Sequence, residues 1–448
     1  MWYNPDKIFF RQVINMDYIQ QTDCKAWQFS EIPEFSCGIR SPLFMDCGTG
    51  LSRIPDFKSK DNSFMHFFRE VKAEDITAYA ALLEADGFVK TYEKDFDGNL
   101  FYQFRVSEGL FYISFMKNGM ARFILDRCRT AEAGKFGYSE HEKICPDTKL
   151  VQYSLHYGKM IKGITCDCGM NYIFRLRDNS LVIIDGGEVE QATDIAVDDY
   201  MKLLHELTQT ANGEKMRISL WLCTHPHNDH CDFMAKLIRF HSDEMEIERI
   251  AFNFPNPKNT RHSISVSAMK QRLCGYYPDA DYIKLHAGTQ FSIANAEFDV
   301  IVSSEDAAGL EEEDPFPWTN SSSMIFRVNA DGASTVFLAD CSDDNGEVIT
   351  DNYGSDVLDC DFLQVAHHGI NKIYDVYEKI NAKSVLLPQC LMNMETRFSE
   401  VYAHLCARYG EENIIFASDA TDIFTLKDGS ITSEKRVHVG TAYDKSDW

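Results

Sequence analysis

Apolar positions follow two different periods in the first 150 residues. Residues 72–85 place apolar side chains three or four positions apart, which predicts a helix that ends before Gly87. Short apolar-rich runs follow at residues 89–94, 100–106, 110–116 and 121–125. They are separated by Asp97-Gly98, Glu108-Gly109 and Asn118-Gly119, dipeptides that readily adopt the positive φ of tight hairpin turns. The pattern therefore predicts a helix followed by an antiparallel meander.

The pattern changes beyond residue 150. Apolar runs at 173–176 and 181–184 flank a polar turn, and residues 199–208 show helical spacing. Residues 218–223 are apolar enough for a strand that is buried on both faces. This order of strands and helix indicates an α/β (α+β) fold class.

Between these two parts, residues 129–148 are rich in small and charged residues and show little apolar periodicity, so we interpret them as a linker. We therefore predict two domains. Residues 1–150 form a small α+β accessory domain with no clustered chemistry of its own, and residues 151–448 form the second domain.

The chain is strongly acidic. Its 448 residues include 44 Lys and Arg against 69 Asp and Glu, a formal net charge of −25. A basic stripe for long duplex nucleic acid is therefore not expected. Charged residues interrupt the first apolar positions, and no run of 18 apolar residues occurs, so we expect neither a signal peptide nor a membrane span. The 14 cysteines are scattered, as free thiols are, and we predict a soluble cytoplasmic protein.

A dense cluster of metal-ligating residues follows the run at 218–223. Within six residues the chain carries His225, His227, Asp229 and His230. Imidazole and carboxylate groups suit Zn²⁺ and other first-row divalent ions, and His-x-His spacing points both rings the same way from an extended segment. A polar loop whose histidines bond locally is disfavoured, because the whole chain has only 14 histidines. The cluster therefore predicts a metal site at the end of a strand.

The spacing of this cluster resembles the H-x-H-x-D-H signature of the metallo-β-lactamase-fold hydrolases. Upstream, Asp185 follows an apolar run and precedes two glycines, like the aspartate that buttresses the metal histidines in that family. Downstream, Asp340 ends an apolar run in the position of the family's metal-bridging aspartate, with Ala339 where the family usually has glycine. The resemblance implies a metallo-β-lactamase αββα sandwich for residues 151–448.

The sequence further resembles one branch of that family, which is named for the DNA-uptake protein ComEC. Residues 362–369 read as a strand and a His-His-Gly turn, and Asn320 begins the Asn-Ser element that this branch carries before the bridging aspartate. The branch commonly lacks the histidine that other members place between the signature and that aspartate. Three histidines lie in this interval, none of them in the expected context at the end of a strand: His241, His262 and His286.

The resemblance implies a site for two divalent ions, zinc with manganese or iron as alternatives. The implied ligands are His225, His227, Asp229, His230, Asp340 and His367. The first two hold one ion, Asp340 bridges, and the other three hold the second ion. His367 is favoured over His368 because it comes first after the strand, which leaves His368 as a catalytic residue for the leaving group; the two assignments are exchangeable. Asp185 and Asn320 are expected to support the ligands from behind.

Two such ions would lower the pKa of a bridging water from near 16 toward about 7 and so produce a hydroxide nucleophile. Asp229 is expected to act as a ligand, as a general base, or as both. The expected substrate is a phosphodiester or another small anionic ester, because two cations clamp both oxygens of an in-line displacement. Lactones, thioesters and β-lactams stay open as alternatives.

A second hypothesis is a binding or sensory protein that retains metal but has little catalytic activity, because the middle histidine of the family is absent. A redox di-iron protein of the same fold would need more Glu and His ligands and a flavin domain, and the sequence shows neither. The expected partner is a small anionic molecule, with no long duplex nucleic acid and no membrane. The oligomeric state is left open.

Overall fold

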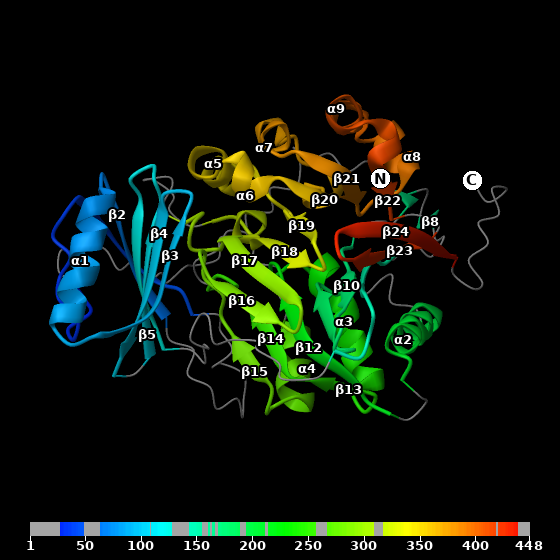
Figure 1. Cartoon of the computed structure of the whole chain (residues 1–448), viewed down its shortest axis with the longest axis horizontal. Helices are drawn as coiled ribbons and strands as arrows, with labels where there is room; N and C mark the ends of the chain where they lie inside the picture. Colours follow the sequence, from blue (N-terminus) through cyan, green and yellow to red (C-terminus); the bar gives the residue numbers. More distant parts are fainter. Residues whose placement is uncertain are drawn as a thin grey trace.

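The structure is a computed structural model that describes residues 27–48, 63–107, 109–127, 143–154, 160–161, 164–165, 169–188, 194–210, 214–256, 267–308, 317–417 and 420–437. These residues form three large sheets, a two-stranded hairpin and the helices that cover the sheets (Figure 1). The hairpin consists of β8 (Met160–Ile161) and β9 (Ile164–Thr165). Among the described residues, no helix combines the length and the apolar character needed to cross a membrane.

The N-terminal sheet has six strands in the order β1-β2-β6-β5-β4-β3, and all its neighbouring pairs are antiparallel. Its elements are β1 (Ile39–Asp46), β2 (Ser63–Arg69), α1 (Ala73–Ala85), β3 (Val89–Phe96), β4 (Asn99–Val106), β5 (Gly109–Phe115) and β6 (Ala121–Asp126). Helix α1 covers the outer face of this sheet (Figure 1), and a core of aromatic side chains such as Phe104 and Phe123 lies between them. The predicted helix and antiparallel meander are confirmed.

The second sheet has nine strands, with the path β15-β14-β12-β11-β10-β7-β23-β24 and β13 beside β12. Its strands are β7 (Thr148–Gln152), β10 (Tyr172–Arg175), β11 (Leu181–Ile184), β12 (Met216–Cys223), β13 (Met245–Ile247), β14 (Arg249–Phe252), β15 (Asp281–Ile283), β23 (Ala420–Lys427) and β24 (Ser430–Val437). Strands β11 and β12 run parallel. Their carboxyl ends therefore reach the same edge of the sheet.

The third sheet has seven strands in the order β16-β17-β18-β19-β20-β21-β22. Its strands are β16 (Gln290–Ile293), β17 (Ala296–Val302), β18 (Ile325–Ala330), β19 (Ala333–Phe337), β20 (Cys360–Gln364), β21 (Ala382–Leu387) and β22 (Ile414–Phe416). Strands β19 and β20 are also parallel neighbours. Each of the two sheets thus brings two strand ends to one edge, which is where polar residues from distant parts of the sequence can meet.

The second and third sheets pack face to face, with helices on both outer faces (Figure 1). Along β11, Val182 and Ile184 face the third sheet, whereas Leu181 and Ile183 face the helices, because successive strand residues point to opposite sides. The helices on the second sheet are α2 (Asp194–Thr208), α3 (Asn228–His241) and α4 (Ser267–Tyr276). Those that follow in the chain are α5 (Asp343–Asn352), α6 (Ser355–Leu358), α7 (Tyr374–Lys379), α8 (Leu391–Thr396) and α9 (Ser399–Tyr409). The predicted α/β class and αββα sandwich are confirmed.

A charge network joins the N-terminal sheet to the segments that flank β16 and β17. We define it as Arg122, Asp126, Lys284, His286, Glu305 and Asp306, each of which is at most 4% exposed. Nε2 of His286 lies 3.1 Å from Oδ2 of Asp126 in the N-terminal sheet, and its Nδ1 lies 3.2 Å from Oε1 of Glu305. Arg122 donates to the backbone carbonyl of Asp306 at 2.5 Å. Ionic side chains buried in this way must stay paired, so the network holds the N-terminal sheet in place.

The change from the N-terminal sheet to the sandwich falls between Asp126, the end of β6, and Thr148, the start of β7. Most of the predicted linker, residues 129–142, lies outside the described residues. The division at residue 150 into an accessory domain and a second domain stays a prediction.

Candidate metal centre

The site begins where β11 ends. Asp185 follows this strand with a left-handed backbone (φ 57°), and it is fully buried. Its Oδ1 accepts a hydrogen bond from the backbone N–H of Thr224 at 2.7 Å, and its Oδ2 accepts one from the Thr224 hydroxyl at 2.8 Å. The same Oδ2 lies 2.7 Å from Nδ1 of His230. Asp185 therefore ties the end of β11 to the segment that carries the histidines.

The next strand, β12, delivers the H-x-H-x-D-H segment. His225 lies two residues past β12, His227 has extended backbone as the residue before α3, and Asp229 and His230 lie in the first turn of α3. This change from extended to helical backbone folds the segment back on itself. As a result the ring of His225 lies 4.7 Å from that of His227 and 4.2 Å from that of His230, centroid to centroid. Glycine at position 186 lets the backbone lie close to α3 and so permits this packing. A Cβ at Gly186 would lie only 2.5 Å from Cβ of Met234 in α3.

Asp340 reaches the same place from the third sheet. It follows β19 after two further residues and is 1% exposed. Ala339 before it has a left-handed backbone (φ 48°), a conformation that glycine adopts more readily than alanine. Neither carboxylate oxygen of Asp340 has a hydrogen-bond partner among the described residues, although both are buried.

The end of β20 supplies the last two histidines. His367 and His368 both have left-handed backbones (φ 47° and 53°) within the short 3₁₀ segment η3 (Ala366–Gly369). Two consecutive non-glycine residues in this conformation are strained, and such strain is concentrated at functional sites. His368 is fully buried, whereas the His367 side chain is 23% exposed. The turn therefore sends one ring inward and the other toward the rim of the site.

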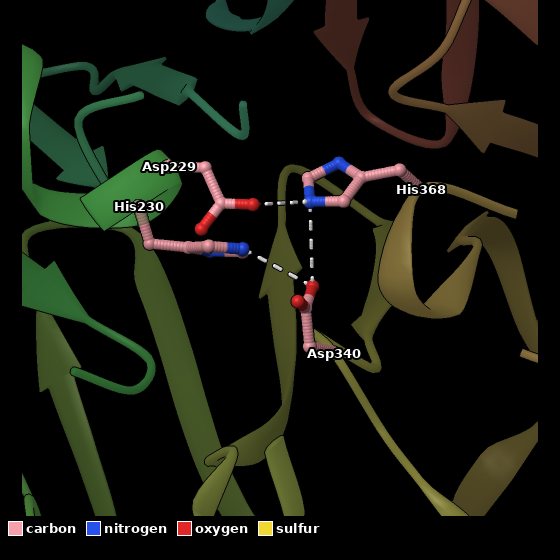
Figure 2. Close-up of side chains that lie close together, drawn as sticks. All are labelled: Asp229, His230, Asp340 and His368. Carbon is pink, nitrogen blue, oxygen red and sulfur yellow. Dashed lines mark ion pairs between the residues drawn. The ribbon is translucent and has the colours of Figure 1, made fainter. Parts of the chain in front are cut away.

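These side chains form two groups that can each hold a metal ion and that share Asp340. The first group is His225, His227 and Asp340. The second group is Asp229, His230, Asp340 and His368. Figure 2 shows the second group, in which Nε2 of His368 lies 3.4 Å from Oδ2 of Asp229 and 3.6 Å from Oδ1 of Asp340. Nε2 of His230 lies 3.1 Å from Oδ1 of Asp340.

The spacing of these atoms fits a divalent metal ion. Two nitrogens bound to one tetrahedral zinc at about 2.0–2.1 Å lie roughly 3.3 Å apart. Nε2 of His225 lies 3.0 Å from Nδ1 of His227 and 3.5 Å from Oδ2 of Asp340, within a few tenths of an ångström of that value. In the second group, Nε2 of His230 and Nε2 of His368 are buried and have no hydrogen-bond partner among the described residues. Buried polar atoms without partners are rare, and a shared cation would satisfy these.

The protonation states of the first group and of the carboxylates also suit a cation. Burial lowers the pKa of His225, and burial together with the charge of His225 lowers the pKa of His227 to about 3, so both rings keep a free lone pair at neutral pH. Burial opposes ionisation of Asp229 and Asp340, yet the nearby His230 holds the pKa of both carboxyls below their usual range. His225 and His227 are therefore in the neutral state that binds metals, whereas Asp340 raises the pKa of His230 and of His368 despite their burial, so an ion in the second group would displace protons from these two rings.

Hydrogen bonds behind the histidines set which ring nitrogen is free. Nδ1 of His230 faces a carboxylate oxygen of Asp185, which only accepts, so Nδ1 carries a proton and Nε2 is the atom left to bind an ion. The Thr224 hydroxyl donates to Asp185 and therefore accepts from Nδ1 of His225, 3.1 Å away. Asp185 thus orients one histidine of each group, as the partners of metal-bound histidines do.

The structure brings five of the six residues that the sequence marked as ligands into the two groups, namely His225, His227, Asp229, His230 and Asp340. His368 lies in the second group, whereas His367 lies in neither group by mutual distance, so the geometry favours the exchanged assignment of the pair. Asn320 lies beside His367, with 3.3 Å between Nδ2 and Nε2. The other histidines considered for the missing ligand lie elsewhere: His241 pairs with Glu244, His286 belongs to the charge network, and His262 lies outside the described residues.

Two residues that complete the site were missed from the sequence. Thr224 relays the Asp185 contact to His225, and Asn371 accepts from Nδ1 of His367 at 2.7 Å. Thr224 directly precedes the signature, and Asn371 lies four residues past His367 in a polar turn. Both residues lie close to the ligands in the sequence, and this closeness was the signal that could have identified them.

Comparisons with known proteins give fold-level similarity alone. No protein-family model matches the sequence, and no curated protein matches it significantly. Zn²⁺-bound PqqB from Methylobacterium extorquens matches at 10% identity over 61% of this chain and 99% of that chain, with a TM-score of 0.38. CmlA, a diiron β-hydroxylase from Streptomyces venezuelae, matches at 12% identity over 65% of this chain and 55% of that chain, with a TM-score of 0.35. Tm1679, a metal-dependent hydrolase of the β-lactamase superfamily, matches at 11% identity over 64% of this chain and 100% of that chain, with a TM-score of 0.34.

The chain spans 55% of that CmlA structure and 36% of a mutant CmlA structure. The chemistry of the site is therefore inferred from its own residues.

Proposed function

We propose that this chain is a metal-dependent hydrolase that holds two divalent ions and cleaves a phosphodiester or another small anionic ester. One observation carries the proposal. Both carboxylate oxygens of Asp340 are buried without hydrogen-bond partners among the described residues, and they face different histidines. A carboxylate placed in this way is suited to bridge two cations.

The two groups divide the ligands between the ions. His225 and His227 hold one ion together with Asp340, and Asp229, His230 and His368 hold the other. When bound, the ions supply positive charge that activates water and stabilises the charge developing on a phosphoryl or acyl group. Asp185 and Thr224 keep the rings of His225 and His230 in the orientation that leaves their Nε2 atoms free.

Asp229 is the residue of the second group that is best placed to receive a proton. Its side chain is 18% exposed, whereas those of His230, His368 and Asp340 are at most 1% exposed. An ionised carboxylate at the solvent side of the site can orient the attacking water and accept its proton. Its low pKa keeps it ionised at neutral pH, although it also limits its strength as a base.

The charge of the chain supports a small substrate. A net charge of −25 repels long polyanions, so the anion must be held mainly by the ions and by the few groups at the rim. We infer that the substrate is a small molecule or a short oligomer that carries one ester group to this rim.

The experiment uses the full chain purified without a chelator. Metals are counted by elemental mass spectrometry, and hydrolysis of bis(p-nitrophenyl) phosphate and p-nitrophenyl acetate is followed with and without added zinc or manganese. About two ions per chain and ester cleavage that Asp340→Asn abolishes would support the proposal. Two ions without cleavage of any ester would support the alternative, a binding or sensory protein. No ions after reconstitution would reject both.

A further inference from the structure

The first group has one ligand fewer than the second. His225, His227 and Asp340 supply three donors, and neither His241 nor His286 can add a fourth, because both are bound elsewhere. We infer that His367 is the missing imidazole ligand of this group. The inference rests on the proposed function, because it assigns a residue to one of its two ions.

The two oxygens of Asp340 divide the surrounding histidines into matching sets. Oδ1 lies 3.1 Å from Nε2 of His230 and 3.6 Å from Nε2 of His368. Oδ2 lies 3.5 Å from Nε2 of His225 and 3.6 Å from Nε2 of His367. Oδ2 of Asp340 therefore faces His367 as Oδ1 faces His368, although His367 lies outside the 4.8 Å that encloses the other ligand atoms of the first group. Its separation from Asp340 matches the separation of other ligand atoms in the site.

The hydrogen bonds of His367 prepare its Nε2 for a cation. Nδ1 lies 2.7 Å from Oδ1 of Asn371, and Nδ2 of the same amide donates to the carbonyl of Cys341 at 2.8 Å, which fixes the amide orientation. An amide oxygen only accepts, so Nδ1 of His367 carries the proton and Nε2 keeps its lone pair. This is the arrangement in which a metal-bound histidine donates its other N–H to an oxygen.

The contact with Asn320 also indicates that Nε2 of His367 keeps its lone pair. Its Nδ2 lies 3.3 Å from Nε2 of His367, long for a hydrogen bond, and its Oδ1 is buried without a partner among the described residues. The amide therefore makes a weak contact that a cation can displace. Rotation of the amide by half a turn would bring its oxygen toward the same cation without changing its shape.

The backbone explains how two adjacent residues can serve different ions. In an extended strand, neighbouring side chains point to opposite faces and cannot meet the two oxygens of one carboxylate. With both residues left-handed, the rings of His367 and His368 lie 6.1 Å apart between centroids, and each Nε2 lies 3.6 Å from a different oxygen of Asp340. One strained turn thus supplies one histidine to each group and replaces a ligand from a separate strand.

The test counts metals in the full chain. Wild type, His367→Ala and the control His241→Ala are stripped with a chelator, reloaded with zinc, desalted and measured by elemental mass spectrometry. His241 suits as the control because its side chain is 18% exposed, close to the 23% of His367, and it lies outside both groups. We expect about two ions in wild type and in His241→Ala, and about one in His367→Ala.

A second variant covers the case in which His367→Ala folds poorly. Asn371→Ala keeps the ring but removes the acceptor of its proton, and it should weaken one of the two ions by about 10–100-fold in chelator competition while the other keeps its affinity. Two ions of wild-type affinity in both variants would overturn the inference, and a raised KM in that case would identify His367 as a substrate contact. Loss of both ions from His367→Ala would overturn its assignment to the first group. Failure of wild type to bind any ion would instead reject the proposed function, and the inference with it.

Discussion

Replacing Asp185 by asparagine separates the metal-binding role of this buried carboxylate from its effect on the backbone. Asparagine has the same shape and tolerates the left-handed conformation (φ 57°) better than most residues, so no backbone strain is added. Only one of the two side-chain oxygens becomes an NH₂ group. In Asp185 these oxygens together accept three hydrogen bonds, two from Thr224 and one from His230.

The NH₂ group only donates, so the asparagine side chain can no longer accept all three hydrogen bonds. The backbone N–H of Thr224 can only donate, so it retains the remaining oxygen, and the NH₂ group then faces Nδ1 of His230. His230 must move its proton to Nε2, the atom that lies 3.1 Å from Oδ1 of Asp340. A protonated Nε2 cannot bind a metal ion. We therefore expect the affinity of the second group for its ion to fall by about 10–100-fold, or roughly 1.4–2.7 kcal/mol, and the first group to be weakened as well, because the Thr224 hydroxyl that orients His225 loses its acceptor.

The free energy of unfolding of the metal-free protein should fall by about 1–3 kcal/mol, the cost of one buried donor without its acceptor. Affinity is measured by competition with a chelator and stability by chemical unfolding. Asp178→Asn is the control, because Asp178 is also buried and accepts bonds from Ser180 and Arg217 at the other end of β11. It should lose a similar stability and keep its metal affinity. Equal metal affinities of Asp185→Asn and wild type would refute the reasoning.

Three further perturbations test other parts of the structure. Asp340→Asn removes the shared carboxylate, so metal content should fall in both groups and ester turnover should be abolished while the circular dichroism spectrum stays that of wild type; full activity would contradict this. Burial alone would lower the pKa of His286, but Glu305 and Asp126 raise it, so its stabilisation is complete below about pH 6.5 and is lost as pH rises through the raised folded-state pKa. The difference in urea midpoint between wild type and His286→Gln should therefore shrink from pH 6 to pH 9, and a constant difference would argue against a charged His286. Phe337→Ala removes a ring that packs between the two sandwich sheets and should lower the free energy of unfolding by about 3–5 kcal/mol in denaturant titration, with a loss below about 1 kcal/mol counting against that packing.

Strands of the sandwich were predictable from the sequence because they are buried on both faces, whereas their αββα arrangement was expected only from the resemblance to a known family. The run at 218–223 became part of β12, and the spacing of His225, His227 and His230 marked the end of that strand. The ligand cluster was predictable for the same reason, since a strand end, a short loop and a helix start are close in sequence. Local pattern was sufficient wherever the contacts are local.

Contacts between distant segments were not predictable in this way. The choice between His367 and His368 depends on their two left-handed backbones, which precede a close approach between Gly369 and Met394: a Cβ at Gly369 would lie 2.8 Å from Cε of Met394. The pairing of His286 with Asp126 joins residues that are 160 positions apart. The sequence around a single histidine does not indicate a partner that lies so far away in the chain.

The shared carboxylate of Asp340 has a consequence for the order in which ions would load. The second group contains two carboxylates, whereas the first contains only the shared one, so the first ion to arrive should occupy the second group. Its charge then offsets the negative charge of Asp340, and the next ion meets a weaker attraction. Loading should be anticooperative, with a half-loaded protein predominant at limiting metal. Hydrolysis that needs both ions would then follow the weaker binding step, so a metal titration read by activity should give a higher apparent Kd than one read by total metal bound.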